Sequence, residues 1–271
     1  MSGKIAIELG HVQETLFLPL WGRAVETQKK EPLLVDKAAV EIINRIDYDF
    51  YAIERNISEI SQLGWIVRSL LIDGTVRCFL DKHPKATIVN IGCGLDTTFD
   101  RIDNGILNWY DLDLPDVIEL RRKFIKENNR RKFIAESFLD EKWTEQLKKE
   151  DNVLFIAAGV FYYFEENQIK SFLNRLSDLY PKSEIILDAT SPIGLKFANK
   201  TVIKSCGLDE RSFLKWGLKR AERLKLFNKR IEIIDELLLF GNVQNKLKTK
   251  IKIIAFISNL FKMQYMIHLR L

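Results

Sequence analysis

Apolar runs alternate with helical patterns through the middle of the chain, and this alternation predicts the fold class. Short runs of apolar and β-branched residues predict strands at residues 86–91, 106–112, 132–135, 152–158 and 184–188. Helical patterns separate them, at residues 115–125, 141–149 and 165–179. Because strands that alternate with helices form a mostly parallel sheet covered on both faces, this region predicts an α/β fold.

The two ends of the chain have different patterns. The segment before Ala86 is helical, with helices predicted over 36–46 and 57–80. Near the other end we predict two strands and an intervening helix, at residues 231–240, 264–271 and 243–262. A late hairpin-like pair beside a parallel sheet makes the sheet mixed. With no repeat or linker in view, we expect one domain over residues 1–271, with a helical N-terminal cap (1–85) and a sheet core (86–271).

Composition narrows the function classes. The 271 residues are 46% hydrophobic and carry a net charge of +5, a surplus too small to argue for nucleic acid. Cys78, Cys93 and Cys206 form no disulfide framework and no metal-ligand spacing. The first residues do not resemble a signal peptide, and the longest uncharged apolar stretch, 253–260, is far shorter than a bilayer span. We therefore expect a cytoplasmic protein without a metal, nucleic-acid or membrane partner; its oligomeric state stays open.

A glycine loop and an acid mark the expected ligand site. Gly92 and Gly94 follow the first strand of the sheet, where ligands bind at the carboxyl ends of parallel strands. Asp113 lies 21 positions after Gly92, close to the spacing at which an acid holds a ribose. Thr97 replaces the third glycine that a dinucleotide requires, which favours S-adenosylmethionine over a nicotinamide cofactor. Two alternatives remain: a purely structural turn, and a metal held by Asp111 with Asp113.

Several motifs in order resemble a known family. They are GCGLDT at 92–97, WYDLDLP at 109–115, AGVFYYF at 158–164 and, upstream, ETLFLPLWGRAVE at 14–26. Together they resemble the leucine carboxyl methyltransferase family, and within it the bacterial branch similar to polyketide-synthesis O-methyltransferases. The resemblance covers roughly residues 14–190. It implies a Rossmann-like class I S-adenosylmethionine-dependent methyltransferase fold, with a seven-stranded, mostly parallel sheet.

The resemblance also implies the cofactor-binding residues: Arg68, Gly92, Gly94, Asp113, Ser137 and Phe138. Arg68 matches the arginine that holds the methionine carboxylate of the cofactor, a role suited to a guanidinium fork. Asp113 matches the ribose acid, and Ser137 and Phe138 match the pair that lines the adenine pocket. One departure is Ala158, where many members carry a glutamate placed to meet the cofactor's ammonium group.

The acceptor side is less defined. Tyr162 and Tyr163 follow the fourth strand and are candidates for lining the substrate site, and Arg23 is a secondary candidate for an anionic acceptor or the cofactor carboxylate. No sequence signal names a general base, although His11 could lie over the mouth of the pocket. Cys93 is expected to be a small spacer between the loop glycines.

The sequence therefore predicts an S-adenosylmethionine-dependent O-methyltransferase that acts on a small-molecule hydroxyl or carboxylate by in-line methyl transfer. The alternatives are a protein C-terminal carboxyl methyltransferase, a nicotinamide-dependent oxidoreductase and a non-catalytic family member that binds the cofactor. The lysine-rich run 246–252 is expected to belong to a helix with one solvated face.

Overall fold

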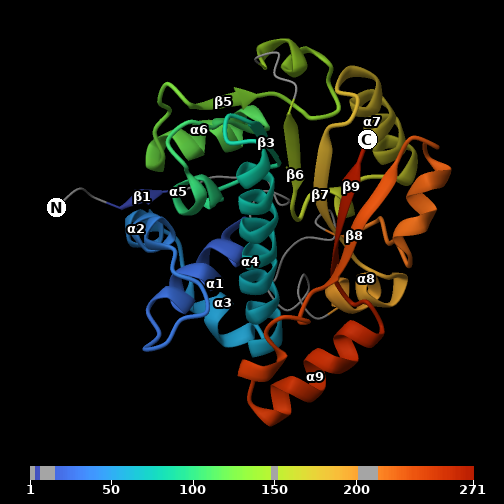
Figure 1. Cartoon of the computed structure of the whole chain (residues 1–271). Helices are drawn as coiled ribbons and strands as arrows, with labels where there is room; N and C mark the ends of the chain where they lie inside the picture. Colours follow the sequence, from blue (N-terminus) through green and yellow to red (C-terminus); the bar gives the residue numbers. More distant parts are fainter. Residues whose placement is uncertain (1–3, 7–15, 148–151, 201–212) are drawn as a thin grey trace.

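The computed structural model describes residues 4–6, 16–147, 152–200 and 213–271. Within these residues, seven strands form one sheet in the order β5-β4-β3-β6-β7-β9-β8 (Figure 1). The strands are β3 (Thr87–Ile91), β4 (Asn108–Asp113), β5 (Arg131–Ala135), β6 (Val153–Ala157), β7 (Glu184–Ala189), β8 (Glu232–Leu238) and β9 (Tyr265–Arg270). Neighbouring strands from β5 to β7 are parallel, whereas β9 runs antiparallel to both β7 and β8. The mixed seven-stranded sheet and the late antiparallel strand confirm the predicted fold class.

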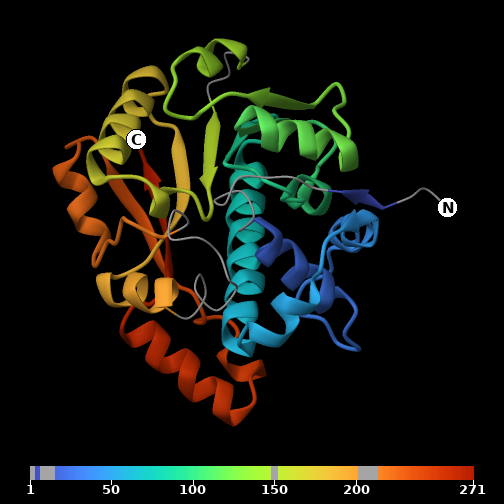
Figure 2. The ribbon, with the colours of Figure 1, turned by 180° about the vertical axis from the view of Figure 1, so that it is seen from behind.

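Helices cover both faces of the sheet, as Figures 1 and 2 show from opposite sides. One face carries α4 (Glu59–Lys82), α5 (Thr98–Ile102), α6 (Pro115–Phe124) and α9 (Thr249–Leu260); the other carries α7 (Glu166–Leu179). Alternate residues of β3 divide between the two cores: Ile88 packs with α4, and Val89 packs on the side of α7. This division follows from the period of two along a strand. The buried central strands are apolar on both faces for the same reason.

The cap before β3 packs against the sheet through α4 and is partly different from the prediction. Helices α1 (Phe17–Thr27) and α2 (Lys37–Arg45) pack on each other, and α1 also packs on α4. The Asp36 carboxylate caps α2 by accepting the Ala39 N–H at 3.0 Å. The helical N-terminal cap is confirmed, and it also contains a pair of two-residue strands that we did not predict: β1 (Ile5–Ala6) pairs in parallel with β2 (Ile46–Asp47).

Other elements differ from the prediction at their ends or were not predicted. The helix expected at 141–149 is a 3-10 turn at Lys142–Gln146, and the one expected at 243–262 divides into a 3-10 turn at Gln244–Lys246 and α9. Helices α3 (Tyr51–Asn56), α5 and α8 (Pro192–Ala198) have seven residues or fewer, too short to show a helical period. Helix α1 is longer and amphipathic, and we did not predict it. Among the described helices, none combines the length and the apolar character that crossing a bilayer requires.

Candidate cofactor site

A cavity of about 670 Å³ opens at the carboxyl ends of the parallel strands. It lies where the strand order reverses, between β3 and β6, as the general rule for open parallel sheets predicts. Its walls include all the candidate residues from the sequence: Arg23, Arg68, Gly92, Gly94, Asp113, Ser137, Phe138, Tyr162 and Tyr163. Ala158, the departure from the family pattern, also lines it. The fold thus brings residues from the cap and from four strand ends to one place.

Packing and hydrogen bonds from neighbouring elements fix the conformation of the glycine loop after β3. Gly92 has φ +61°, and a Cβ there would come within 2.4 Å of the Val160 side chain, so both the turn and the close packing require glycine. Arg121 of α6 donates to the Gly94 carbonyl at 2.7 Å and the Asp96 carbonyl at 2.8 Å. Because these loop carbonyls are occupied by a buried guanidinium, the loop's conformation is set before any ligand binds.

Asp113 closes the loop from the neighbouring strand. Its Oδ2 accepts the Gly94 N–H at 2.7 Å and its Oδ1 accepts the Leu114 N–H at 2.8 Å. Burial raises the pKa of the Asp113 carboxyl to about 6, and these two hydrogen bonds offset only part of that effect. Each carboxylate oxygen has a second lone pair. At neutral pH, Asp113 is therefore an ionised acceptor at the cavity wall.

A buried polar cluster lies at the ends of β6 and β7. Arg68 Nη1 donates to Asp188 Oδ2 at 2.7 Å, and Asp188 Oδ1 accepts the Gly159 N–H at 2.8 Å. Gln264 Nε2 donates to Asp188 Oδ2 and to the Tyr162 hydroxyl, both at 3.1 Å. Since a guanidinium carries five N–H donors, the pair with Asp188 orients Arg68 and leaves it able to bind a ligand carboxylate.

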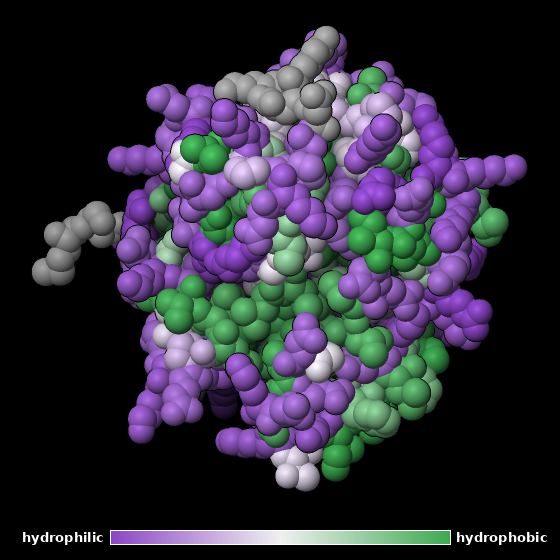
Figure 3. Space-filling view, in the orientation of Figure 1, coloured by the Kyte–Doolittle hydropathy of each residue, from purple (hydrophilic) through white to green (hydrophobic). Residues whose placement is uncertain are grey.

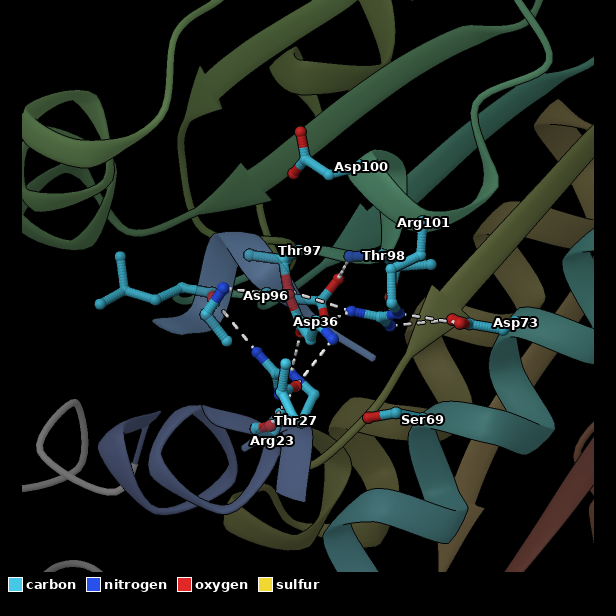
Figure 4. A network of polar contacts seen from close by, with 12 residues as sticks. Arg23, Thr27, Asp36, Ser69, Asp73, Asp96, Thr97, Thr98, Asp100 and Arg101 are labelled. Atoms are coloured by element: carbon cyan, nitrogen blue, oxygen red, sulfur yellow. Dashed lines mark hydrogen bonds and ion pairs between the residues drawn. The ribbon is translucent and has the colours of Figure 1, made fainter. Parts of the chain in front are cut away.

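Arg23 connects the cap to the cofactor loop rather than standing alone as a ligand group. Its Nε donates to Asp36 Oδ2 at 2.8 Å and its Nη2 donates to the Leu95 carbonyl at 3.3 Å. Figure 4 shows Asp36 between Arg23 and Arg101, with Thr97 donating to the same carboxylate. The secondary role predicted for Arg23 as an anion ligand stays a prediction, but two of its nitrogens already serve this network.

The network extends to α4 and to the loop carboxylate. Arg101 pairs with Asp73 through two nitrogens, each 2.8 Å from a carboxylate oxygen. Burial raises the pKa of Asp96, but the Arg23 and Arg101 charges outweigh this and lower it to about 2. Asp96 Oδ2 then accepts the Thr98 N–H at 2.9 Å. Alternating buried charges thus fasten α1, α2, α4 and α5 to the loop that lines the cavity.

The adenine and acceptor candidates combine packing with access to the cavity. Phe138 is buried and packs edge-on against Phe164 and Phe172, so it is a core residue as well as a wall. The Ser137 hydroxyl accepts the Leu139 N–H at 3.2 Å. Burial raises the pKa of the Tyr162 hydroxyl well above its usual range, so this phenol stays protonated and serves as an orienting group rather than a base.

The burial of Asp111 and Cys93 bears on two alternative roles considered for them, a metal ligand and a nucleophile. Asp111 does not face the cavity with Asp113: its carboxylate is buried and binds Arg121 at 2.8 Å and Arg131 at 2.9 Å. The described residues hold no cluster of three potential metal ligands. Burial raises the pKa of the Cys93 thiol well above its usual range, in agreement with a spacer rather than a nucleophile. His11 and Cys206 lie outside the described residues.

Asp188 and Gln264 are site residues that we did not predict. Asp188 stands at the carboxyl end of the fifth predicted strand, so the rule that singled out Asp113 could have found it. Gln264 immediately precedes β9, and it reaches the site because β9 returns antiparallel beside β7. The Asp36 network combines residues that are far apart in the sequence, so no local sequence pattern predicts it.

Comparisons with known proteins agree with this geometry. Residues 17–177 match the family model described as leucine carboxyl methyltransferase. The chain is 33% identical over 193 residues, 71% of each protein, to the tetracenomycin polyketide synthesis O-methyltransferase TcmP of Streptomyces glaucescens. It is 27% identical over 222 residues to the S-adenosyl-L-methionine-dependent methyltransferase dpfgK of Gibberella zeae, covering 73% of this chain and 74% of that protein.

A solved structure extends the likeness to nearly the whole fold. It is the crystal structure of a DUF574 family protein from Streptomyces avermitilis MA-4680, with a TM-score of 0.63. The superposition covers 96% of this chain and 99% of that one at 10% sequence identity. At this identity the likeness concerns the fold alone, and it includes both the cap and the C-terminal strands.

Proposed function

Because the chain belongs to the leucine carboxyl methyltransferase family, we propose that its cavity binds S-adenosylmethionine and that the protein methylates an oxygen of a small molecule. One observation carries the proposal: the glycine loop, the Asp113 carboxylate and the Arg68 guanidinium line the same cavity. Its volume of about 670 Å³ is in the range of small-molecule and cofactor sites.

The chemistry of the wall fits the three parts of such a cofactor. The Asp113 carboxylate is an acceptor for ribose hydroxyls, and the Arg68 fork is a partner for the amino-acid carboxylate. Ser137 and Phe138 provide one polar and one apolar group for a purine. Ala158 contributes no charge, so no side-chain carboxylate at that position meets the cofactor's ammonium group.

The acceptor end supports positioning more than proton transfer. When bound, the cofactor supplies an electrophilic methyl group on a sulfonium. Tyr162 and Tyr163 line this region together with apolar side chains, among them Leu239 and Phe240. A carboxylate acceptor is already a nucleophile at neutral pH, and an in-line displacement depends largely on orientation. The protonated Tyr162 hydroxyl accepts a hydrogen bond from Gln264 and directs its proton to Asp188, so this side chain is suited to fix the shape of the acceptor wall.

Thermal unfolding with S-adenosylhomocysteine tests the cofactor assignment. We expect the melting temperature to rise with this ligand and to stay constant with NADH, because only a ligand of the native state stabilises it. An absence of any shift with S-adenosylhomocysteine, confirmed by calorimetry, would overturn the assignment. A shift with NADH alone would support the oxidoreductase alternative.

Transfer of a labelled methyl group into a cell extract tests the reaction. We expect the label in a small molecule. Treatment with alkali then identifies the product, because a methyl ester releases the label and a methyl ether keeps it. Label in protein C-termini would favour the protein carboxyl methyltransferase. Binding without any transfer would favour the non-catalytic alternative.

A further inference from the structure

Helix α9 buries one side and exposes large apolar side chains on the other. Ile251, Ala255 and Asn259 are buried. The exposed side carries Ile253, Phe256, Ile257, Leu260 and, just after the helix, Phe261, each 47–66% exposed. The spacing i, i+3, i+4, i+7 places them in one stripe. We expected a helix with one solvated face in the region of the lysine run 246–252, and the solvated face of α9 carries this apolar stripe as well as Lys250 and Lys252.

Helix α8 extends the same apolar surface. Ile193 and Phe197 are each at least half exposed. The two helices are joined at their ends, because the Ser191 N–H donates to the Lys262 carbonyl and the Ser191 hydroxyl to the Phe261 carbonyl, both at 2.9 Å. We call Ile193, Phe197, Ile253, Phe256, Ile257, Leu260 and Phe261 the α8–α9 surface. Figure 3 shows hydrophobic side chains gathered at the lower right, where Figure 1 places α9.

Positive charge borders this surface. Residues 237–271 contain no Asp or Glu, and their basic residues are Lys246, Lys248, Lys250, Lys252, Lys262 and Arg270. Lys262 and Arg270 pair with glutamates of β7 or β8. The four lysines from 246 to 252 are exposed, and none has an ion pair within the described part of the chain. Since the whole chain carries only +5, its positive surplus is concentrated beside α9.

The charge pattern distinguishes between two possible occupants. If two copies of the chain paired through α9 about a two-fold axis, the lysines at 246–252 of one copy would lie near those of the other. Residues 237–271 contain no acid that could neutralise them, so charge repulsion disfavours this dimer. An anionic lipid surface complements both features, because lysines attract its headgroups and Phe, Ile and Leu side chains enter the boundary with the acyl chains. We propose that the α8–α9 surface docks this protein on anionic membranes.

The proposal departs from our expectation of no membrane partner, which rested on the shortness of every apolar stretch; docking on a membrane surface requires no spanning segment. Docking through this surface would also place the cavity close to the membrane. Phe197 belongs to the α8–α9 surface and lines the cavity, and Ser258 of α9 lines it as well. The cavity therefore adjoins the docking surface.

Co-sedimentation with vesicles tests the docking. We expect the full chain to bind phosphatidylcholine–phosphatidylglycerol vesicles at least tenfold more tightly than phosphatidylcholine vesicles, and less tightly as salt is added. Each lysine near an anionic surface contributes about 1 kcal/mol, roughly fivefold in affinity. Substitution of the four lysines 246, 248, 250 and 252 by Gln should therefore lower binding at least tenfold. Phe256→Ser with Leu260→Ser should also lower it.

A charge-matched control replaces four exposed lysines elsewhere, Lys30, Lys82, Lys85 and Lys126, by Gln and should leave vesicle binding unchanged. Equal binding to the two vesicle types, or equal loss in the control, overturns the proposal. A dimer seen by light scattering that Phe256→Ser dissociates, without vesicle binding, assigns the surface to a second copy instead. Calorimetry with S-adenosylhomocysteine on the same proteins keeps the two proposals separate, since either binding can fail alone.

Discussion

Asp113→Asn is the substitution that tests the ribose role most cleanly. The amide is nearly isosteric with the carboxylate and keeps one oxygen, so it can still accept the Gly94 N–H that closes the loop at 2.7 Å. What it loses is the negative charge and the second acceptor oxygen. In the wild type each oxygen already accepts one backbone N–H, and the remaining lone pairs are those available to two ribose hydroxyls.

The magnitude follows from these contacts. A hydrogen bond to a charged group contributes about 1.5–3 kcal/mol, and the variant retains only one neutral acceptor. We expect the affinity for S-adenosylhomocysteine, measured by isothermal titration calorimetry at pH 8, to fall between about tenfold and about a hundredfold. The variant keeps the Gly94 hydrogen bond and loses the one to Leu114, so the melting temperature of the ligand-free variant should fall by only a few degrees.

Titration adds a second signature of the same carboxylate. The pKa of Asp113 in the free protein is raised to about 6, so the group takes up a proton at higher pH than an exposed aspartate. Because ribose binding needs the ionised form, the wild-type affinity should be constant above about pH 7 and fall by up to tenfold per unit below about pH 6. The Asn variant should show no such dependence.

A matched control is Glu119→Gln on the exposed face of α6, which removes one charge near the site without touching the cavity. It should bind the ligand as wild type does. An Asp113→Asn affinity within twofold of wild type, or a pH profile identical in both proteins, would refute the ribose role of Asp113.

Three further outcomes follow from buried groups. Asp188→Asn leaves Arg68 buried without its charge partner and should lower the free energy of unfolding by about 3 kcal/mol in urea titrations; an unchanged midpoint contradicts this. Asp36→Ala removes the carboxylate shared by two arginines and should lower both stability, by at least about 3 kcal/mol, and cofactor affinity; an unaltered affinity would detach the cap from the site. Iodoacetamide at pH 8 should modify exposed Cys78 and spare Cys93, as peptide mass spectrometry would reveal; rapid labelling of Cys93 would contradict its raised pKa.

The fold was predictable where periodicity is strong. The β-branched run before Gly92 and the apolar runs at 152–158 and 184–188 became the buried central strands β3, β6 and β7. Short elements were not predictable, because a helix of five residues such as α5 spans less than two turns and shows no period. The β1–β2 pair has only two residues in each strand, and its pairing depends on contacts distant in sequence.

The site residues also divide into those that local sequence spacing predicts and those that depend on tertiary contacts. Asp113 was accessible from the sequence because its spacing from Gly92 reports a strand–helix–strand unit. Asp188 stands near the carboxyl end of a predicted strand and was accessible to the same rule, although we did not apply it there. Gln264 was missed because its contact with Asp188 requires the antiparallel return of β9, which sequence spacing does not encode. Arg23 lines the cavity, and its predicted role toward an anion stays a prediction; its ion pair with Asp36 appears only when α1 and α2 are packed together.

A crystal structure of the complex with S-adenosylhomocysteine would show which groups of the cavity hold the cofactor. We predict that the ribose hydroxyls contact the Asp113 carboxylate and that the amino-acid carboxylate contacts the Arg68 guanidinium. Ligand bound with its ribose away from Asp113, or no ligand in the cavity at saturating concentration, would contradict the assignment of this cavity to S-adenosylmethionine.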